Sequence, residues 1–225
     1  MKILPLAKTL AAATLALAFA APASADTVKI NGFTYTPVKP LNVSSSSPAA
    51  AYNNLGSGQF SGTLNGNAFV TFCTELTQAF SIGTTYTDYS IVNGLAAWGN
   101  TVYQGLNHLM SYGAANSLPS DPTNSAVFQA AVWEVIYQTD GVYNFGSGNF
   151  TATSNDAATQ TALNGWNWNT VMNTPITVTT DQLYSPNHQN FLVTAPVPEP
   201  ESYAMMLAGL SLVGAIARRR RSSAS

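Results

Sequence analysis

Residues 125–138 read Ser-Ala-Val-Phe-Gln-Ala-Ala-Val-Trp-Glu-Val-Ile-Tyr-Gln, without a glycine or a proline. As a helix, this stretch would carry apolar residues around most of its circumference, a pattern typical of a helix buried on more than one side. Asn124 or Ser125 is suited to cap its start, and Asp140-Gly141 is suited to end it. We therefore expect the strongest helix of the protein here, buried in the core.

The stretch Ala68-Phe-Val-Thr-Phe-Cys73 predicts a central, well-buried β-strand, because it is nearly continuous in apolar, aromatic and β-branched residues. Asn65-Gly66-Asn67, just before it, is typical of a hairpin turn. Serine, proline, asparagine and glycine predict a loop at 44–48 and a turn at 54–58. Further strands are expected at residues 28–35, 59–64, 86–91, 175–183 and 189–194.

Two more helices are predicted from the spacing of apolar residues. Leu95–Met110 has the spacing of an amphipathic helix, and Pro119 and Pro122 are expected to close that unit. The second helix is expected at 156–166, with Ser154 or Asn155 as its cap. The sequence thus predicts a single α+β domain over residues 26–196, with a central antiparallel sheet and about three helices.

The first 25 residues have the pattern of a secretory signal peptide. Lys2 and Lys8 flank an apolar run that extends from residue 10 to residue 21. Ala23-Ser24-Ala25 supplies the small residues that signal peptidase recognises. We expect cleavage after Ala25, so that the mature protein begins near Asp26.

The charge of the predicted domain excludes some classes of partner. Residues 26–196 contain two lysines, no arginine and eight carboxylates, which gives a net charge of −6. Nucleic acids and anionic lipids need clustered cations, so neither is expected to bind. The abundance of serine, threonine, asparagine, glycine and tyrosine predicts a neutral, hydroxyl-rich surface suited to a polysaccharide matrix or a cell wall.

Three unlike features follow one another in residues 197–225. Pro198-Glu199-Pro200 keeps the backbone extended, as a processing site requires. The uncharged apolar segment 203–217 is at or just below the roughly 17–25 residues that a helix needs to cross a bilayer. Arg218, Arg219, Arg220 and Arg221 then predict that this end stays on the cytoplasmic side, so that the domain before it faces outward.

This triplet, helix and arginine cluster resemble the PEP-CTERM sorting signal of exopolysaccharide-producing Gram-negative bacteria. The resemblance implies transient anchoring in the inner membrane, cleavage near Pro198–Pro200 by an exosortase-type processing enzyme, and delivery to the cell surface or the extracellular matrix. An ordinary tail anchor would explain the helix and the arginines but not the Pro-Glu-Pro triplet.

Cys73 is the only cysteine of the chain, although the signal peptide directs the protein to an oxidising compartment. A single cysteine there predicts an intermolecular disulfide, a buried inert thiol or a thiol with chemistry of its own. Phe72-Cys73 lies at the end of the predicted buried strand, and Gln129 lies on the first turn of the predicted buried helix.

Phe72-Cys73 and the Gln129-Ala130-Ala131-Val132-Trp133 stretch resemble the thioester (TQxA-type) domains of bacterial surface adhesins. Phe128 stands where that pattern has threonine. The resemblance implies an internal thioester between Cys73 and Gln129, which an amine or a hydroxyl of a partner would open to form a covalent bond.

No pattern of catalytic residues or of metal ligands emerges elsewhere. Glu75 and Glu134 could be the carboxylate pair of a glycosidase, but solvated charges are the alternative. His108 and His188 have no zinc-ligand spacing, and no cofactor or metal is expected. Trp166 and Trp168 are candidates either for the core or for stacking on sugar rings.

The sequence therefore predicts an exported surface or matrix protein, not an enzyme, that adheres covalently through Cys73 and Gln129. Exopolysaccharide and surface amines or hydroxyls are the expected partners. A non-covalent matrix or carbohydrate-binding protein with an inert Cys73 is the alternative, and an extracellular hydrolase is a third.

Overall fold

The computed structural model of the protein describes residues 25–196. Several predicted features lie outside this range: the signal peptide with Ala23, the Pro198-Glu199-Pro200 triplet, the apolar segment and the arginines at 218–221. Within the range, no helix has the length and apolar character needed to cross a bilayer.

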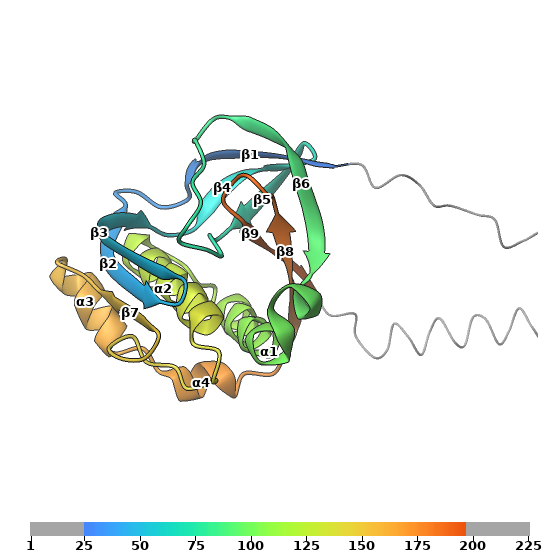
Figure 1. Ribbon diagram of the computed structural model, residues 1–225. Coiled ribbons are helices and arrows are strands. Elements are labelled where there is room, and N and C mark those ends of the chain that lie inside the picture. The colour runs from blue at the N-terminus through green and yellow to red at the C-terminus, as the bar shows by residue number, and fades with distance from the viewer. Residues whose placement is uncertain (1–24, 197–225) are drawn as a thin grey trace, which may run out of the picture.

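Within residues 25–196, nine strands form two antiparallel sheets, and four helices complete the α+β fold that the sequence predicts (Figure 1). The larger sheet has the order β5 (Asn67–Thr71), β4 (Phe60–Leu64), β1 (Asp26–Phe33), β6 (Thr85–Asn93), β8 (Val178–Tyr184), β9 (Phe191–Pro196). The smaller sheet has the order β3 (Ala49–Ser57), β2 (Lys39–Ser46), β7 (Phe150–Thr153). The helices are α1 (Gly94–Ala115), α2 (Pro122–Tyr137), α3 (Ala157–Asn164) and α4 (Trp168–Met172).

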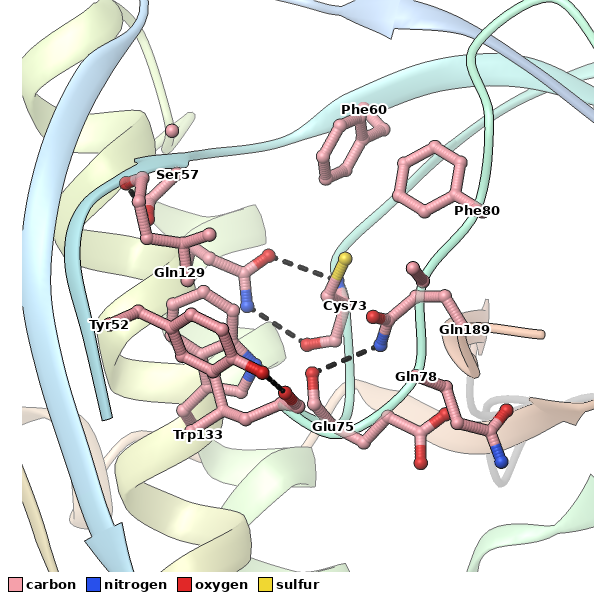
Figure 2. Close-up of a pocket in the computed structure, with 14 residues that line it drawn as sticks. Tyr52, Ser57, Phe60, Cys73, Glu75, Gln78, Phe80, Gln129, Trp133 and Gln189 are labelled. Atoms are coloured by element: carbon pink, nitrogen blue, oxygen red, sulfur yellow. Dashed lines mark hydrogen bonds between the residues drawn. The ribbon is translucent and has the colours of Figure 1, made fainter. Parts of the chain in front are cut away.

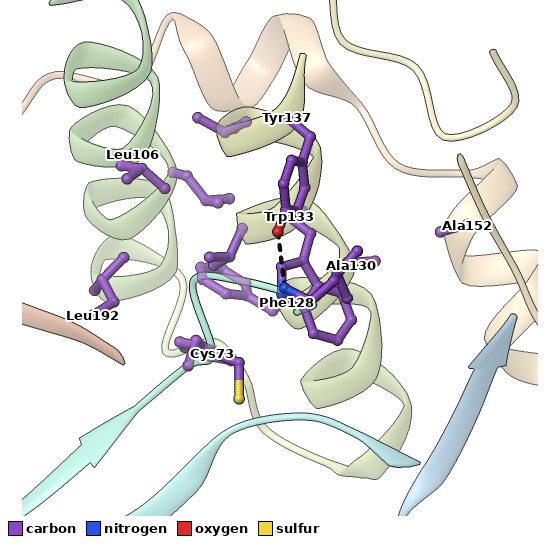
Figure 3. Close-up of a cluster of buried hydrophobic side chains, with 14 of the residues drawn as sticks. Cys73, Leu106, Phe128, Ala130, Trp133, Tyr137, Ala152 and Leu192 are labelled. Atoms are coloured by element: carbon purple, nitrogen blue, oxygen red, sulfur yellow. Dashed lines mark hydrogen bonds between the residues drawn. The ribbon is translucent and has the colours of Figure 1, made fainter. Parts of the chain in front are cut away.

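Helix α2 lies in the middle of the molecule, as its sequence predicts. It contacts all three strands of the smaller sheet as well as α1 and α3, while α1 packs on β8 and β6 of the larger sheet. Twelve of its sixteen residues are buried. Figure 3 shows Phe128, Ala130 and Trp133 of α2 packed between Leu106 of α1 on one side and Ala152 of β7 on the other.

The start of α2 was predicted wrongly. Asp121, not Asn124 or Ser125, caps the helix, by accepting the backbone N–H of Asn124 at 2.9 Å. Pro122 then occupies the first helical position, where a missing N–H costs no hydrogen bond. Pro122 therefore opens this helix instead of closing the unit before it. Similarly, α3 is capped by Asp156 instead of by Ser154 or Asn155.

The loop predicted at 44–48 and the turn predicted at 54–58 are also wrong, because most of these residues belong to the β2–β3 hairpin. Asn54 does have the positive φ of a turn residue, 55°. However, Asn54 does not end the strand. It lies at an irregularity in the pairing of β2 with β3, where the register shifts between Leu41 and Val43. Pairing with β7 completes the sheet, which local sequence does not reveal.

The strand at 68–73 is not central, contrary to the prediction. It forms β5, the outer strand of the larger sheet, and Val70 is 54% exposed. The preceding hairpin turn is confirmed, with positive φ at Asn65 and Gly66. The other predicted strands and both further helices are present with shifted ends, whereas β7 and α4 were not predicted.

The two outer strands of the larger sheet meet just beyond β5. Cys73 forms an isolated antiparallel bridge with Phe191, and the Leu192 N–H donates to the carbonyl of Phe72 at 3.0 Å. The hydroxyl of Thr71 also donates to the carbonyl of Leu192 at 2.7 Å. The sheet therefore curls so that its open edges join at Cys73, which explains why the strand is buried only at this end.

Candidate functional site

Cys73 and Gln129, separated by 55 residues in the sequence, lie against each other in the core. Cys73 follows β5 at the junction with β9, and Gln129 lies in α2. Phe72 and Phe128, which precede Cys73 and Gln129 in the sequence, stack on each other with ring centroids 5.2 Å apart. Cys73 is 7% exposed and Gln129 is 1% exposed.

The carboxamide of Gln129 forms two hydrogen bonds with the backbone of Cys73 (Figure 2). The Cys73 N–H donates to Oε1 of Gln129 at 2.9 Å, and Nε2 of Gln129 donates to the Cys73 carbonyl at 2.9 Å. This reciprocal pair fixes the orientation of the carboxamide plane next to the residue that carries the thiol. The structure thus brings together the two residues that the sequence predicts as a site.

The expected position of Gln129 on the first turn of its helix is wrong, because α2 begins at Pro122, seven residues earlier. The positive end of the helix dipole therefore does not face Cys73, since its effect is confined to the first turn. Burial raises the pKa of the Cys73 thiol far above its usual range, and the charge of Glu75 raises it further. The resting group is consequently a thiol, not a thiolate.

A pocket of about 240 Å³ opens next to this pair. Phe60, Phe80 and Trp133 form apolar parts of its wall, together with Cys73 and Gln129 (Figure 2). The size suits one small group or side chain, since pockets for drug-sized ligands are about 300–1,000 Å³. A group that entered it would reach the Cys73–Gln129 pair.

Tyr52 crosses the pocket from β3, and its hydroxyl donates to the backbone carbonyl of Leu76 at 2.6 Å. Tyr52 is 41% exposed, so it forms part of the boundary between the pocket and solvent. Tyr52 has no local sequence signal for this position, because it stands between two segments expected to be irregular. Only the pairing of β2 with β3 places it over the site.

Glu75 lines the same pocket, and its Oε1 accepts the backbone N–H of Asn190 at 2.8 Å. Burial raises the pKa of this carboxyl, and the hydrogen bond from Asn190 partly offsets that rise. Glu134, its candidate partner in a glycosidase pair, instead accepts the backbone N–H of Asn144, in the loop after α2. The two carboxylates thus serve different parts of the structure.

The remaining candidate residues, two histidines and two tryptophans, make contacts that belong to the packing of the fold. Nδ1 of His108 lies 2.7 Å from the carbonyl of Thr174, and the ring of His188 packs on Tyr86 with centroids 4.3 Å apart. Across residues 25–196, no three histidine, cysteine, aspartate or glutamate side chains gather as a metal site. Trp166 and Trp168 are half-buried and pack on each other and on Phe145. These contacts favour a role in packing over stacking on sugar rings.

Comparison with models of protein families matches residues 196–221 to the PEP-CTERM protein-sorting motif. The chain carries a PEP-CTERM sorting motif. The matched residues include the triplet Pro198–Pro200 and the four arginines, as the sequence resemblance implied. The PEP-CTERM motif marks the chain as an exported protein that passes through the membrane and is processed by an exosortase.

Comparisons of the chain with curated proteins and with solved structures found no match. The resemblance of the folded domain to thioester adhesins therefore stays a prediction. The domain is continuous with the PEP-CTERM motif, because β9 ends at Pro196, where the matched residues begin. The same strand begins at Phe191, which bridges Cys73.

Proposed function

We propose that this exported PEP-CTERM protein attaches covalently to a surface or matrix partner through an internal thioester between Cys73 and Gln129. The observation that carries the proposal is the pair of hydrogen bonds by which the Gln129 carboxamide is fixed to the backbone of Cys73. An amide is a poor acyl donor, so the reaction requires a nucleophile held in position next to it. A buried carboxamide that two hydrogen bonds hold against the backbone of the cysteine meets that requirement.

The same contacts supply the groups that formation of the thioester needs. Sγ of Cys73 attacks Cδ of Gln129, the C–N bond breaks, and the thiol proton passes to the departing nitrogen, which leaves as ammonia. The Cys73 N–H, 2.9 Å from Oε1, stabilises the negative charge that develops on that oxygen. The Cys73 carbonyl holds the nitrogen before it leaves. Because the thiol has a raised pKa, we expect formation to be slow and to follow folding.

The thioester would then be opened by a nucleophile of the partner that enters the pocket. The nucleophile bonds to the acyl carbon of Gln129 and the thiol of Cys73 is released, so the protein is consumed in one event and is not an enzyme. The domain offers few amines that could react prematurely. It has two lysines, and Nζ of Lys39 lies 2.7 Å from a carboxylate oxygen of Asp156.

The intact mass of the protein, expressed as the full chain and isolated after export and processing, tests the proposal. We expect a mass lower than the sequence requires by one ammonia, and addition of methylamine should convert the acyl group to a methylamide. Cys73→Ala and Gln129→Ala should each abolish the loss. Gln104→Ala is the matched control, because Gln104 lies on α1 and does not line the pocket; it should keep the loss.

A non-covalent binding protein is the second candidate, and the raised pKa of the buried Cys73 thiol favours it. In that case the two hydrogen bonds of Gln129 would serve only to join α2 to the end of β5. The expected result would be an unmodified mass with a thiol that reacts with alkylating reagents only after unfolding. That result would refute the covalent proposal and leave matrix binding as the function.

A further inference from the structure

Trp133 has a buried hydrogen-bond donor that is not used within the domain. The residue is 3% exposed, and its Nε1 has no hydrogen-bond partner among the described residues. A tryptophan N–H usually finds a partner when it is buried, and leaving one unpaired costs free energy. An unpaired donor at a site that would react therefore points to a partner that arrives later.

The indole that carries this donor borders the site. Trp133 follows Gln129 by four residues in α2, so the two side chains lie on the same face of the helix, and both line the pocket. When ammonia leaves Gln129, the space next to the acyl carbon is freed. An incoming nucleophile must occupy that space to attack.

We propose that the Trp133 N–H binds the oxygen of an incoming hydroxyl, so that the pocket takes an alcohol, such as a hydroxyl of a polyol or a sugar, in preference to an amine. This inference rests on the proposed thioester. It assigns the class of nucleophile and gives Trp133 a role in selecting it.

The number of lone pairs gives the preference a chemical reason. A hydroxyl oxygen has two lone pairs, so it can accept the Trp133 N–H with one and attack the acyl carbon with the other. A neutral amine nitrogen has only one lone pair, which the attack itself requires. In the balanced step, the alcohol oxygen bonds to Cδ of Gln129, the C–S bond breaks, and the hydroxyl proton passes to the sulfur of Cys73.

Other groups in the pocket agree with a neutral, hydroxyl-bearing ligand. Oε1 of Gln78 is a second buried polar atom without a partner in the described part of the chain, and it can accept from another hydroxyl. Glu75, the one carboxylate among the described residues that line the pocket, accepts the Asn190 N–H, and burial raises its pKa, which weakens its attraction for an ammonium group. Aromatic rings such as Phe60 and Phe80 provide the apolar surface on which the carbon skeleton can rest.

The test uses the protein expressed as the full chain and isolated after export and processing, with glycerol and methylamine as competing probes and intact mass as the readout. Loss of ammonia is measured first, and the ratio of ester to amide is measured second. Trp133→Phe keeps an aromatic ring but removes the N–H. We expect the ester-to-amide ratio to fall about five- to tenfold in this variant, the value of one hydrogen bond.

A second measurement does not depend on the folding of the variant. The wild-type ratio of ester to amide is compared with the ratio that a simple alkyl thioester gives in the same mixture, and we expect the protein's ratio to be higher. Equal ratios, or an unchanged ratio in Trp133→Phe, overturn this inference while ammonia loss still supports the thioester. Absence of ammonia loss from the wild-type chain overturns both.

Discussion

Oε1 of Glu134 accepts the backbone N–H of Asn144 at 2.5 Å, although the side chain of Glu134 has no exposed surface. Its other carboxylate oxygen has no partner among the described residues. Burial raises the pKa of this carboxyl to about 7, the hydrogen bond from Asn144 partly offsets the rise, and the charge of Asp140 adds to it. The loop after α2 is thus held to the core by a hydrogen bond to a carboxyl whose pKa is raised to about 7.

This arrangement predicts that the protein is most stable in mild acid. The pKa of Glu134 is higher in the folded state, so the folded state binds more protons, and the free energy of unfolding should fall as pH rises from about 4.5 to about 7. Glu134→Gln should remove most of that fall, which is about 3 kcal/mol from the size of the shift. Urea unfolding at pH 4, 6 and 8 measures it. Asp26→Asn, which changes a carboxylate of β1 that does not act on Glu134, is the control and should keep the fall; a parallel pH profile for wild type and Glu134→Gln would contradict the assignment.

Removing the cap of α2 should destabilise the domain without changing the chemistry of Cys73. Asp121→Ala removes the acceptor for the Asn124 N–H, and we expect a loss of about 1 kcal/mol in the free energy of unfolding. Thr123→Ala, two residues further on, lacks such a bond and should cost less. Chemical denaturation of both variants provides the comparison, and equal losses would show that Asp121 is not the cap.

Gly113 allows α1 to approach α2 where Phe128 precedes Gln129. A Cβ at this position would lie 2.7 Å from the ring of Phe128, so Gly113→Ala must displace that ring. We expect a loss of about 1–3 kcal/mol in stability and slower loss of ammonia, because Gln129 moves with its neighbour. In Gly146→Ala the nearest atom would be 3.4 Å away, and both quantities should stay near the wild-type values. A stable Gly113→Ala with unchanged ammonia loss would show that the contact is not tight.

Tyr52 is expected to protect the thioester from water. Tyr52→Phe removes the hydroxyl that donates to Leu76, so the ring loses its fixed position over the pocket and hydrolysis should become several-fold faster. Tyr184→Phe is the matched control, since Tyr184 has a similar exposure, 40% against 41%, and makes no hydrogen bond through its hydroxyl within the described residues. The mass increase by one water over time gives both rates. Equal rates would remove Tyr52 from the protection of the site.

The PEP-CTERM motif predicts that sorting is separable from folding. A chain truncated after Pro196 retains β9 and every described contact of the Cys73 site, but it lacks the triplet and the arginines. In a host with an exosortase, we expect the truncated protein to accumulate in a different place from the full chain. Fractionation with detection of both forms measures this, and identical distributions would show that the tail is not the sorting signal.

Local sequence predicted the elements whose signals lie within a few residues of one another. The continuous apolar pattern of α2 and the Asn65-Gly66 turn are of this kind, and both are present. The β2–β3 hairpin was missed because its serines, alanines and asparagines have no strong strand preference. That hairpin is stabilised by β7, which lies about 100 residues further along the chain.

The sequence by itself determined the PEP-CTERM sorting motif, the α+β class and the choice of Cys73 and Gln129 as a pair, because each depends on residue type and order. Tertiary structure decided where the pair stands. Cys73 lies at the junction of β5 with β9, and Gln129 lies in the middle of α2 instead of at its start. Burial of the thiol, the enclosure of the pocket by Tyr52 and the unpaired N–H of Trp133 likewise arise only when segments distant in sequence pack together.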